Sequence, residues 1–480
     1  MRLIRLTAAA VLVCCAFART SSAQCVSEVR QVASRSSFPT LVAGPIAWSG
    51  TILAVASNQD KNDSVWVSLF SEHGDLLYPS VKVPSSDDSK LIGIFWNGNH
   101  FALFYENADH FIILRRISTT AQLIGAEIRP LPKLKLADDD QLDLLWSDGL
   151  AAYVLARTVT IAPRGLWLTY INTDGTVRSN VQLAPVPAPD SIVKLAITET
   201  LVLGVFFEQD ISHNLMLLRI AAGEPNFLHK VWTAGFDDDL VVTAADNQFV
   251  LARTDVQPDT RKTIRWKIVD NSGFDVRPDS RLLIGTGQDV KPISLMARDG
   301  EFALSYLDAR DGFDMQTPIY RLHRFELDGD TISDTYFAAA DRTRFRAKSD
   351  YDFLWTGSAY LSVAARETDD GTDSYLLRLC PLIAHISAPR TVNRGQTVTF
   401  DGTAEGGVPQ YQYLWKWGER DTATGQTLQI KYDTPGFYTV TLIVTDDSDT
   451  QTAQTFSVTV TDLPPPPPPP AAPKRRPVRK

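Results

Sequence analysis

Apolar and polar positions alternate in short runs along most of the chain, and one pattern of such runs recurs. In one copy an apolar run reaches Trp96, an Asn97-Gly98-Asn99 turn follows, and a second run alternates from Phe101. Seven copies, spaced about 50 residues apart, begin near residues 44, 91, 142, 192, 240, 292 and 351. No helical period separates them, so the pattern predicts a repeated all-β unit.

Each copy is predicted to hold four strands. In the fifth copy they are expected at 240–245, 248–254, 263–270 and 276–284. The first two are joined by a few Asn, Asp, Ser or Gly residues, as a tight hairpin requires. Seven copies of four antiparallel strands predict a seven-bladed β-propeller, because a row of sandwich domains would need about 100 residues per unit and would break the period.

Glycine marks the turn between the third and fourth strands, where a positive φ is needed. Such turns are expected at 72–75, 173–176, 271–274 and 327–330. The second and fourth copies lack this signal. Short turns between the first and second strands lie on the same face as these, which we call the turn face. The longer connections lie on the other, the loop face.

The last copy supplies only three strands, at 352–355, 360–364 and 374–379. A fourth is available near the N-terminus, at 25–33, and would close the ring and remove its exposed edges. Cys25 and Cys380 would then lie on neighbouring strands. These are the two cysteines left after export, so we expect a disulfide between them, worth at most roughly 5 kcal/mol on the chain-entropy account.

The first residues predict export. Arg2 and Arg5 precede an apolar run from Leu6 to Phe17, and the small residues 21–23 follow, so 1–23 is interpreted as a signal peptide. An uncleaved anchor is the alternative. No later stretch approaches the length of a membrane helix, so no transmembrane span is predicted. The expected location is secreted, periplasmic or on the cell surface.

Charge separates the body of the chain from its end. The chain has 47 basic and 56 acidic residues, and five of the basic ones lie in the last seven residues. The acidic body would repel nucleic acid and attract cations or basic partners. Residues 463–480 begin with a proline run and are predicted to be a disordered, proline-rich basic tail. The tail is either a solubilising linker or a contact to an anionic envelope polymer.

Composition changes at residue 383, where Thr, Val, Gly and Gln become frequent and about seven short strands fit within 383–462, the size of a small sandwich. The motifs YQYLWKW at 411–417, YDTPGFYTVTLIVTD at 432–446 and FSVTVTD at 456–462 resemble a PKD domain, an immunoglobulin-like module of secreted and surface proteins. Only Gly418-Glu419-Arg420 departs from the usual Gly-Asp-Gly turn. The resemblance implies a non-catalytic spacer or adhesion unit toward proteins and polysaccharides.

The predicted organisation is therefore all-β and has four parts: a signal peptide at 1–23, a seven-bladed propeller at 24–382, a PKD-like sandwich at 383–462 and a tail at 463–480.

An aspartate recurs before the first hairpin in six of the seven copies, on the loop face, where function usually resides. These residues are Asp88, Asp139, Asp190, Asp238, Asp289 and Asp350. Because the first strand of each blade should be innermost, they are expected to surround one mouth of the central channel. They would form a cation or ligand site, or each would only cap a turn into a strand.

Two loops also crowd carboxylates around a glycine, as calcium loops do. Their candidate ligands are Asp308, Asp311 and Asp314, and Asp369, Asp370 and Asp373. Neither loop has the EF-hand spacing, so solvated acidic loops remain the alternative. Calcium is the one cofactor that the sequence suggests.

Catalytic motifs are weak. The sequence has no HExxH pair and no G-x-S-x-G elbow, and 57–66 only approaches the Asp-box of propeller glycosidases. His100 is expected on a hairpin surface. The tryptophans before the hairpins are expected to pack between blades, namely Trp48, Trp96, Trp146 and Trp355.

These patterns favour an exported, non-enzymatic binding or adhesion protein, which would recognise an extracellular protein, a polysaccharide or other glycan, or a cation. The alternatives are a propeller-type carbohydrate hydrolase or lyase with an accessory PKD module, and a purely structural envelope component.

Overall fold

The computed structural model describes residues 28–33, 44–58, 64–85, 89–138, 140–160, 164–184, 192–208, 214–221, 227–232, 236–256, 262–282, 290–298, 301–308, 319–326, 331–336, 353–368, 371–418, 421–447 and 450–462. Its regular elements are all strands. None of the segments that it describes is a helix able to cross a membrane. Residues 1–23 and 463–480 lie outside it, so the signal peptide and the tail stay predictions.

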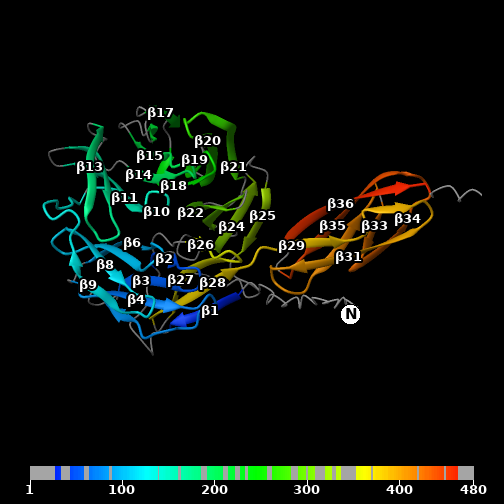
Figure 1. Cartoon of the computed structure of the whole chain (residues 1–480), viewed down its shortest axis with the longest axis horizontal. Coiled ribbons are helices and arrows are strands. Elements are labelled where there is room, and N and C mark those ends of the chain that lie inside the picture. The colour runs from blue at the N-terminus through cyan, green and yellow to red at the C-terminus, as the bar shows by residue number, and fades with distance from the viewer. Residues whose placement is uncertain are drawn as a thin grey trace, which may run out of the picture.

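Seven four-stranded antiparallel sheets, the blades, are arranged around a common centre (Figure 1). Blade one holds β2 (Ile46–Trp48), β3 (Leu53–Asn58), β4 (Val65–Phe70) and β5 (Val81–Lys82). Blade two holds β6 (Lys90–Trp96), β7 (Phe101–Glu106), β8 (Ile112–Ile117) and β9 (Leu123–Ile128). Blade three holds β10 (Leu142–Ser147), β11 (Ala152–Val159), β12 (Gly165–Ile171) and β13 (Val177–Ala184).

The remaining blades repeat this order. Blade four holds β14 (Val193–Ile197), β15 (Leu203–Glu208), β16 (Leu215–Ile220) and β17 (Phe227–Trp232). Blade five holds β18 (Phe236–Ala245), β19 (Gln248–Val256), β20 (Lys262–Asp270) and β21 (Asp275–Leu282). Blade six holds β22 (Val290–Arg298), β23 (Glu301–Asp308), β24 (Ile319–Glu326) and β25 (Thr331–Tyr336). Blade seven holds β26 (Phe353–Trp355), β27 (Tyr360–Thr368), β28 (Gly371–Leu379) and β1 (Glu28–Ala33).

The blades form a closed ring. The first strand of each blade contacts the first strands of both neighbours, in a cycle that returns from β26 to β2. The apolar cores lie between blades, since each alternating strand buries one face against the next sheet. One of these cores joins Ala303 of blade six, Leu377 of blade seven and Leu53 of blade one. The predicted seven-bladed propeller is therefore confirmed.

The N-terminal strand completes blade seven, as expected from the sequence. In Figure 1 the dark blue β1 lies beside β28, and the two pair antiparallel with Glu28 opposite Arg378 and Arg30 opposite Leu376. Cys380, just beyond β28, is 1% exposed and disulfide-bonded. Cys25 lies outside the described residues, so its pairing with Cys380 stays a prediction.

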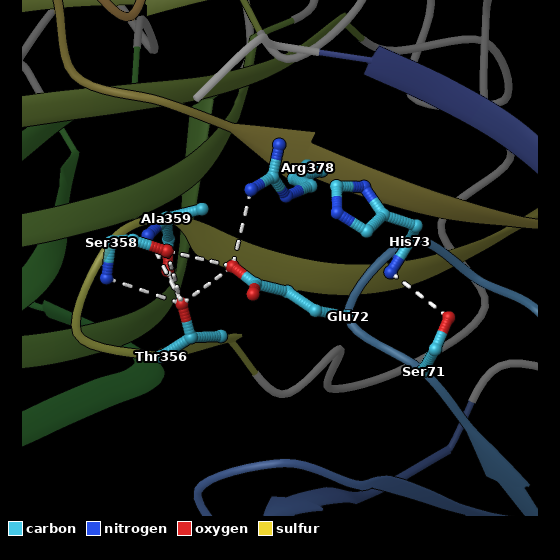
Figure 2. A network of polar contacts seen from close by, with 7 residues as sticks. All are labelled: Ser71, Glu72, His73, Thr356, Ser358, Ala359 and Arg378. Carbon is cyan, nitrogen blue, oxygen red and sulfur yellow. Dashed lines mark hydrogen bonds and ion pairs between the residues drawn. The ribbon is translucent and has the colours of Figure 1, made fainter. Parts of the chain in front are cut away.

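A polar cluster joins blade one to blade seven on the turn face (Figure 2). Glu72 Oε1 accepts hydrogen bonds from Ser358 Oγ at 2.8 Å and Thr356 Oγ1 at 3.0 Å, and Arg378 Nη2 lies 3.2 Å away. Desolvation opposes ionisation of Glu72, but these hydrogen bonds and the charge of Arg378 together outweigh it and lower the pKa of the carboxyl group. We call these four residues the seam cluster.

Glycines in the turns between third and fourth strands pack closely against the preceding blade. Gly74, Gly175 and Gly273 have φ values of 81°, 86° and 87°, in the left-handed region that favours glycine. A Cβ on Gly175 would lie 2.6 Å from Ile128 of the preceding blade, and one on Gly74 would lie 3.1 Å from Leu376 of blade seven. Blade one thus packs on blade seven as blade three packs on blade two. The fourth predicted turn, 327–330, lies outside the described residues.

The tryptophans at or next to the ends of the first strands pack against the blade cores, as expected. Three face an aromatic residue directly across their hairpin: Trp96 opposite Phe101, Trp146 opposite Tyr153 and Trp355 opposite Tyr360. Their ring centroids lie 4.7 to 4.9 Å apart.

The expectation for His100 was wrong. This residue is only 5% exposed, because its ring turns inward to within 3.1 Å of Asn97 Nδ2. Asn97 Nδ2 in turn lies 2.7 Å from the Tyr153 hydroxyl of blade three. His100 is therefore part of a contact between blades.

A β-sandwich follows the propeller, with sheets ordered β29-β31-β34 and β30-β36-β35-β32-β33. Its strands are β29 (Ile383–Ser387), β30 (Thr391–Asn393), β31 (Thr397–Glu405), β32 (Gln412–Lys416), β33 (Thr422–Thr424), β34 (Thr427–Lys431), β35 (Gly436–Thr445) and β36 (Gln451–Thr461). Trp415 is fully buried between the sheets, and its Nε1 donates to Gly425 O at 2.8 Å. The sandwich predicted after the propeller is confirmed, with one strand more than expected.

Candidate functional site: a cleft on the loop face of blade three

A cleft of about 350 Å³ opens at the loop-face end of blade three. The connection from blade two, residues 131–134, covers one side of it. The sheet of blade three forms the other side through Arg157, Val159, Trp167 and Asn180. Pockets of this size, largely apolar with a few polar groups, are typical small-molecule sites.

Strand register explains why these side chains meet. In β11 the side chains of Tyr153 and Leu155 belong to the core shared with blade two, and Arg157 follows them on the same face because side chains alternate along a strand. Trp167 on β12 lies directly opposite Arg157 on β11, and Asn180 on β13 lies directly opposite Thr169 on β12. Residues opposite each other point the same way, so one sheet face presents them together.

Arg157 is a buried cation whose described hydrogen-bond partners are neutral. Its side chain is 2% exposed, Nη1 donates to Thr169 Oγ1 at 2.7 Å, and Nη2 donates to Asn180 Oδ1 at 3.1 Å. Its guanidinium lies 5.7 Å from the centre of the Trp167 ring. Within the described part of the chain, Nε finds no hydrogen-bond acceptor and the guanidinium has no ion pair.

Burial lowers the pKa of Arg157 to about 10, against the opposing effect of Asp140. The group therefore stays protonated at neutral pH while it is largely removed from water. Taking such a charge out of water costs several kcal/mol unless an anion compensates it. A buried cation that has only neutral hydrogen-bond partners among the described residues, beside an open cleft, is the arrangement expected of an anion-binding site.

The rest of the cleft is mostly apolar. Leu131, Pro132, Leu134 and Val159 line it beside the half-buried indole of Trp167. Lys133 adds a second positive charge at the exposed rim. The cleft thus combines a deep guanidinium, a rim ammonium and an aromatic wall.

Asp140 supports the backbone beside the cleft. Its Oδ1 accepts hydrogen bonds from the amide and hydroxyl of Thr160, both at 2.9 Å, and its Oδ2 accepts from the Ala137 amide at 2.9 Å. A carboxylate with these bonds holds the connection from blade two against the end of β11. Asp140, the sequence neighbour of Asp139, therefore caps a turn on the loop face.

Most of the aspartates singled out from the sequence lie outside the described residues: Asp88, Asp139, Asp190, Asp289, Asp350, Asp311, Asp314, Asp369 and Asp370. The backbone places Asp238 on β18, Asp308 at the end of β23 and Asp373 on β28. The ring of aspartates and the calcium loops therefore stay predictions. Among the residues described, no three His, Cys, Asp or Glu side chains gather as metal ligands.

One expected loop is shorter than the composition suggested. The acidic stretch 368–373 was expected to be an open loop, but β27 extends to Thr368 and β28 begins at Gly371. Thr368 pairs with Gly371 and Arg366 pairs with Asp373. The ladder continues because backbone pairing satisfies polar groups that an open loop would leave to water.

A second polar contact lies between the innermost strands of blades three and four. Asp143 on β10 accepts a hydrogen bond from the Leu195 amide of β14 at 2.6 Å. Desolvation raises the pKa of Asp143, while Lys194 and backbone amides oppose the rise. The hydrogen bond from Leu195 indicates that Asp143 links the two blades.

Sequence reasoning missed the cleft, although a signal was present. The pentapeptide VLART occurs at 154–158 and again at 250–254, and in each it sets an arginine in the buried second strand of a blade. Arg253, in the second copy, is fully buried as well. An arginine within an apolar alternation marks a cation that needs a partner.

One comparison with known proteins identifies the sandwich domain. The family model of the PKD domain matches residues 380–460, which confirms that resemblance. No curated protein matches the chain. Among solved structures, the chain is similar to the WD40 domain of SCAP from fission yeast, with 10% identity over 90% of this chain and 98% of that one and a TM-score of 0.38. Drosophila Semaphorin 2a is similar with 9% identity, coverage of 92% and 98%, and a TM-score of 0.41.

The molecule therefore combines a seven-bladed propeller with a C-terminal PKD domain. This combination suggests an extracellular binding or adhesion module.

Proposed function

We propose that the protein is an exported, non-enzymatic binding protein whose propeller captures an anionic ligand in the cleft of blade three. The observation that carries the proposal is Arg157, a 2% exposed cation with neutral hydrogen-bond partners beside an open cleft of about 350 Å³. An anion would compensate the buried charge and strengthen its own hydrogen bonds in a medium of low dielectric constant.

The other parts of the chain take supporting roles in this proposal. The PKD domain is a spacer or adhesion unit toward proteins or polysaccharides, and the tail at 463–480 contacts an anionic envelope polymer. The aspartates before the first hairpins, with any calcium in the loops near 308–314 and 368–373, would form a separate cation site on the loop face. Calorimetry that detects no calcium uptake at millimolar concentration would remove that site.

A binding screen with a turnover assay tests the proposal. The mature chain is applied to an array of acidic and neutral glycans and small organic acids, and released reducing sugar is measured in parallel. Trp167→Ala removes the aromatic wall of the cleft. Its matched control is Trp232→Ala, because Trp232 is a buried tryptophan of blade four, outside the cleft. Thermal denaturation shows whether each variant is folded.

We expect retention of an anionic member of the array without release of sugar, and loss of that binding in folded Trp167→Ala but not in folded Trp232→Ala. Equal binding by the wild type and Trp167→Ala would exclude the cleft. Release of sugar would instead support the alternative, a carbohydrate hydrolase or lyase.

A further inference from the structure

We infer that the ligand of the blade-three cleft is a carboxylate carried on a ring. The inference rests on the proposed function and makes it specific. The charge of the cleft favours one negative charge, its apolar walls require an uncharged body, and its tryptophan favours a ring. Each of these properties comes from a different set of side chains.

The charge follows from three groups. Arg157 and Lys133 bring two positive charges to the cleft, and Asp140, whose field acts on Arg157, offsets one of them. The balance suits a monoanion better than a dianion such as a phosphate monoester. A planar guanidinium also matches the two oxygens of a carboxylate. Nη1 and Nη2 each donate one described hydrogen bond, which leaves each a second N–H.

The body of the ligand follows from the walls. A bare inorganic anion would leave Leu131, Leu134 and Val159 facing empty space in a cleft of about 350 Å³. Trp167 offers an aromatic surface beside the guanidinium. Flat apolar surfaces stack on indole rings, whether they belong to an aromatic ring or to the face of a sugar. A ring-borne carboxylate therefore has two sources, a uronate residue of an acidic polysaccharide or a free aromatic acid.

Matched pairs of ligands test the inference by isothermal titration calorimetry with the full mature chain. Phenylacetate is compared with phenylacetamide, and glucuronate with glucose, because each pair differs in the carboxylate while the ring is kept. Acetate serves as the anion without a ring. The variant Lys133→Ala removes the rim charge. Lys135→Ala is its control, since Lys135 lies on the same connection but contacts Phe111 outside the cleft.

We expect at least one acid to bind about tenfold or more tighter than its neutral partner, a factor that corresponds to about 1.4 kcal/mol. Acetate should bind far more weakly than either ring acid. Lys133→Ala should weaken the acid about threefold to tenfold and reduce its dependence on salt, while Lys135→Ala changes it less than about twofold. Arg157→Lys keeps the positive charge but loses the planar guanidinium that can donate two hydrogen bonds to a carboxylate, so it should weaken binding of the acid about tenfold. The acid that binds identifies the source.

Equal affinity for an acid and its neutral partner would overturn the inference while the proposed function stands. The same holds if acetate binds as tightly as the ring acids, or if Lys133→Ala and Lys135→Ala behave alike. If no probe binds the wild type and the array retains only a ligand without a carboxylate, the carboxylate is excluded but the binding function is not. If nothing binds in either experiment, both proposals fail.

Discussion

The seam cluster predicts a stability difference between two acidic residues of one turn. Glu72 and Asp75 both reach from blade one to blade seven, where Glu72 meets Arg378 at 3.2 Å and Asp75 meets Arg30 at 2.6 Å. The two pairs differ in exposure: the side chains of Glu72 and Arg378 are 25% and 5% exposed, against 60% and 43% for Asp75 and Arg30. Only the first pair is removed from water.

Glu72→Gln is expected to lower the free energy of unfolding by about 1–2 kcal/mol at pH 7. The substitution keeps a side-chain oxygen for the hydroxyls of Thr356 and Ser358 but removes the charge that faces Arg378, and hydrogen bonds to charged groups are worth about 1.5–3 kcal/mol. Because Glu72 is a quarter exposed and partly solvated, the expected loss is placed around and somewhat below the lower end of that range. Asp75→Asn is the matched control and should change stability little, since exposed ion pairs contribute little.

The Glu72 effect should also depend on pH. The pKa of Glu72 lies below its usual 4.5 in the folded protein, so the carboxylate contributes stability that is fully present above that value and is lost as the pH falls through the folded pKa. The gap between the wild type and Glu72→Gln should therefore close in acid. Urea denaturation followed by tryptophan fluorescence measures both effects. A loss in Asp75→Asn equal to that in Glu72→Gln, or a gap that does not change with pH, would refute the reasoning.

Three further measurements test other parts of the ring. Gly175→Ala should destabilise the protein by about 1–3 kcal/mol more than Gly98→Ala, because both glycines have a φ of 86° but only the Gly175 Cβ would meet a neighbouring blade, and thermal denaturation compares them. Burial, aided by Arg116, lowers the pKa of His100 below its usual 6.5, so wild-type stability should fall as the pH drops from 7 to 5, and His100→Gln should lose this dependence in urea denaturation. Mass mapping of the secreted protein should find Cys25 bonded to Cys380, and two free thiols would contradict the bridge.

The blades could be predicted because their signals are local. Strand alternation and turn residues placed the second strand of blade five at 248–254, and the structure has it at Gln248–Val256. The N-terminal strand was found by counting, since six copies had four strands and the last had three. The turn residues of a hairpin and the period of the repeat are set by residues close together in the sequence, so both can be recognised without knowledge of the tertiary structure.

The cleft could not be predicted in the same way. It exists because residues 131–134 and Arg157 line the same cleft. These segments are separated in the chain by β10, and no local sequence pattern predicts that they meet. His100 was misplaced for a similar reason, since its inward turn depends on Asn97 and on Tyr153 of the next blade. Acidic composition suggested an open loop at 368–373, where backbone pairing continues the hairpin.

Hydrogen–deuterium exchange of β1 tests the closed ring most directly. The amides of Glu28–Ala33 that face β28 should exchange as slowly as those of β13, the outermost strand of blade three, because both strands pair with one neighbour in the same way. Exchange of β1 at the rate of an unstructured peptide, with β13 protected, would show that the N-terminal strand does not complete blade seven and would contradict the account.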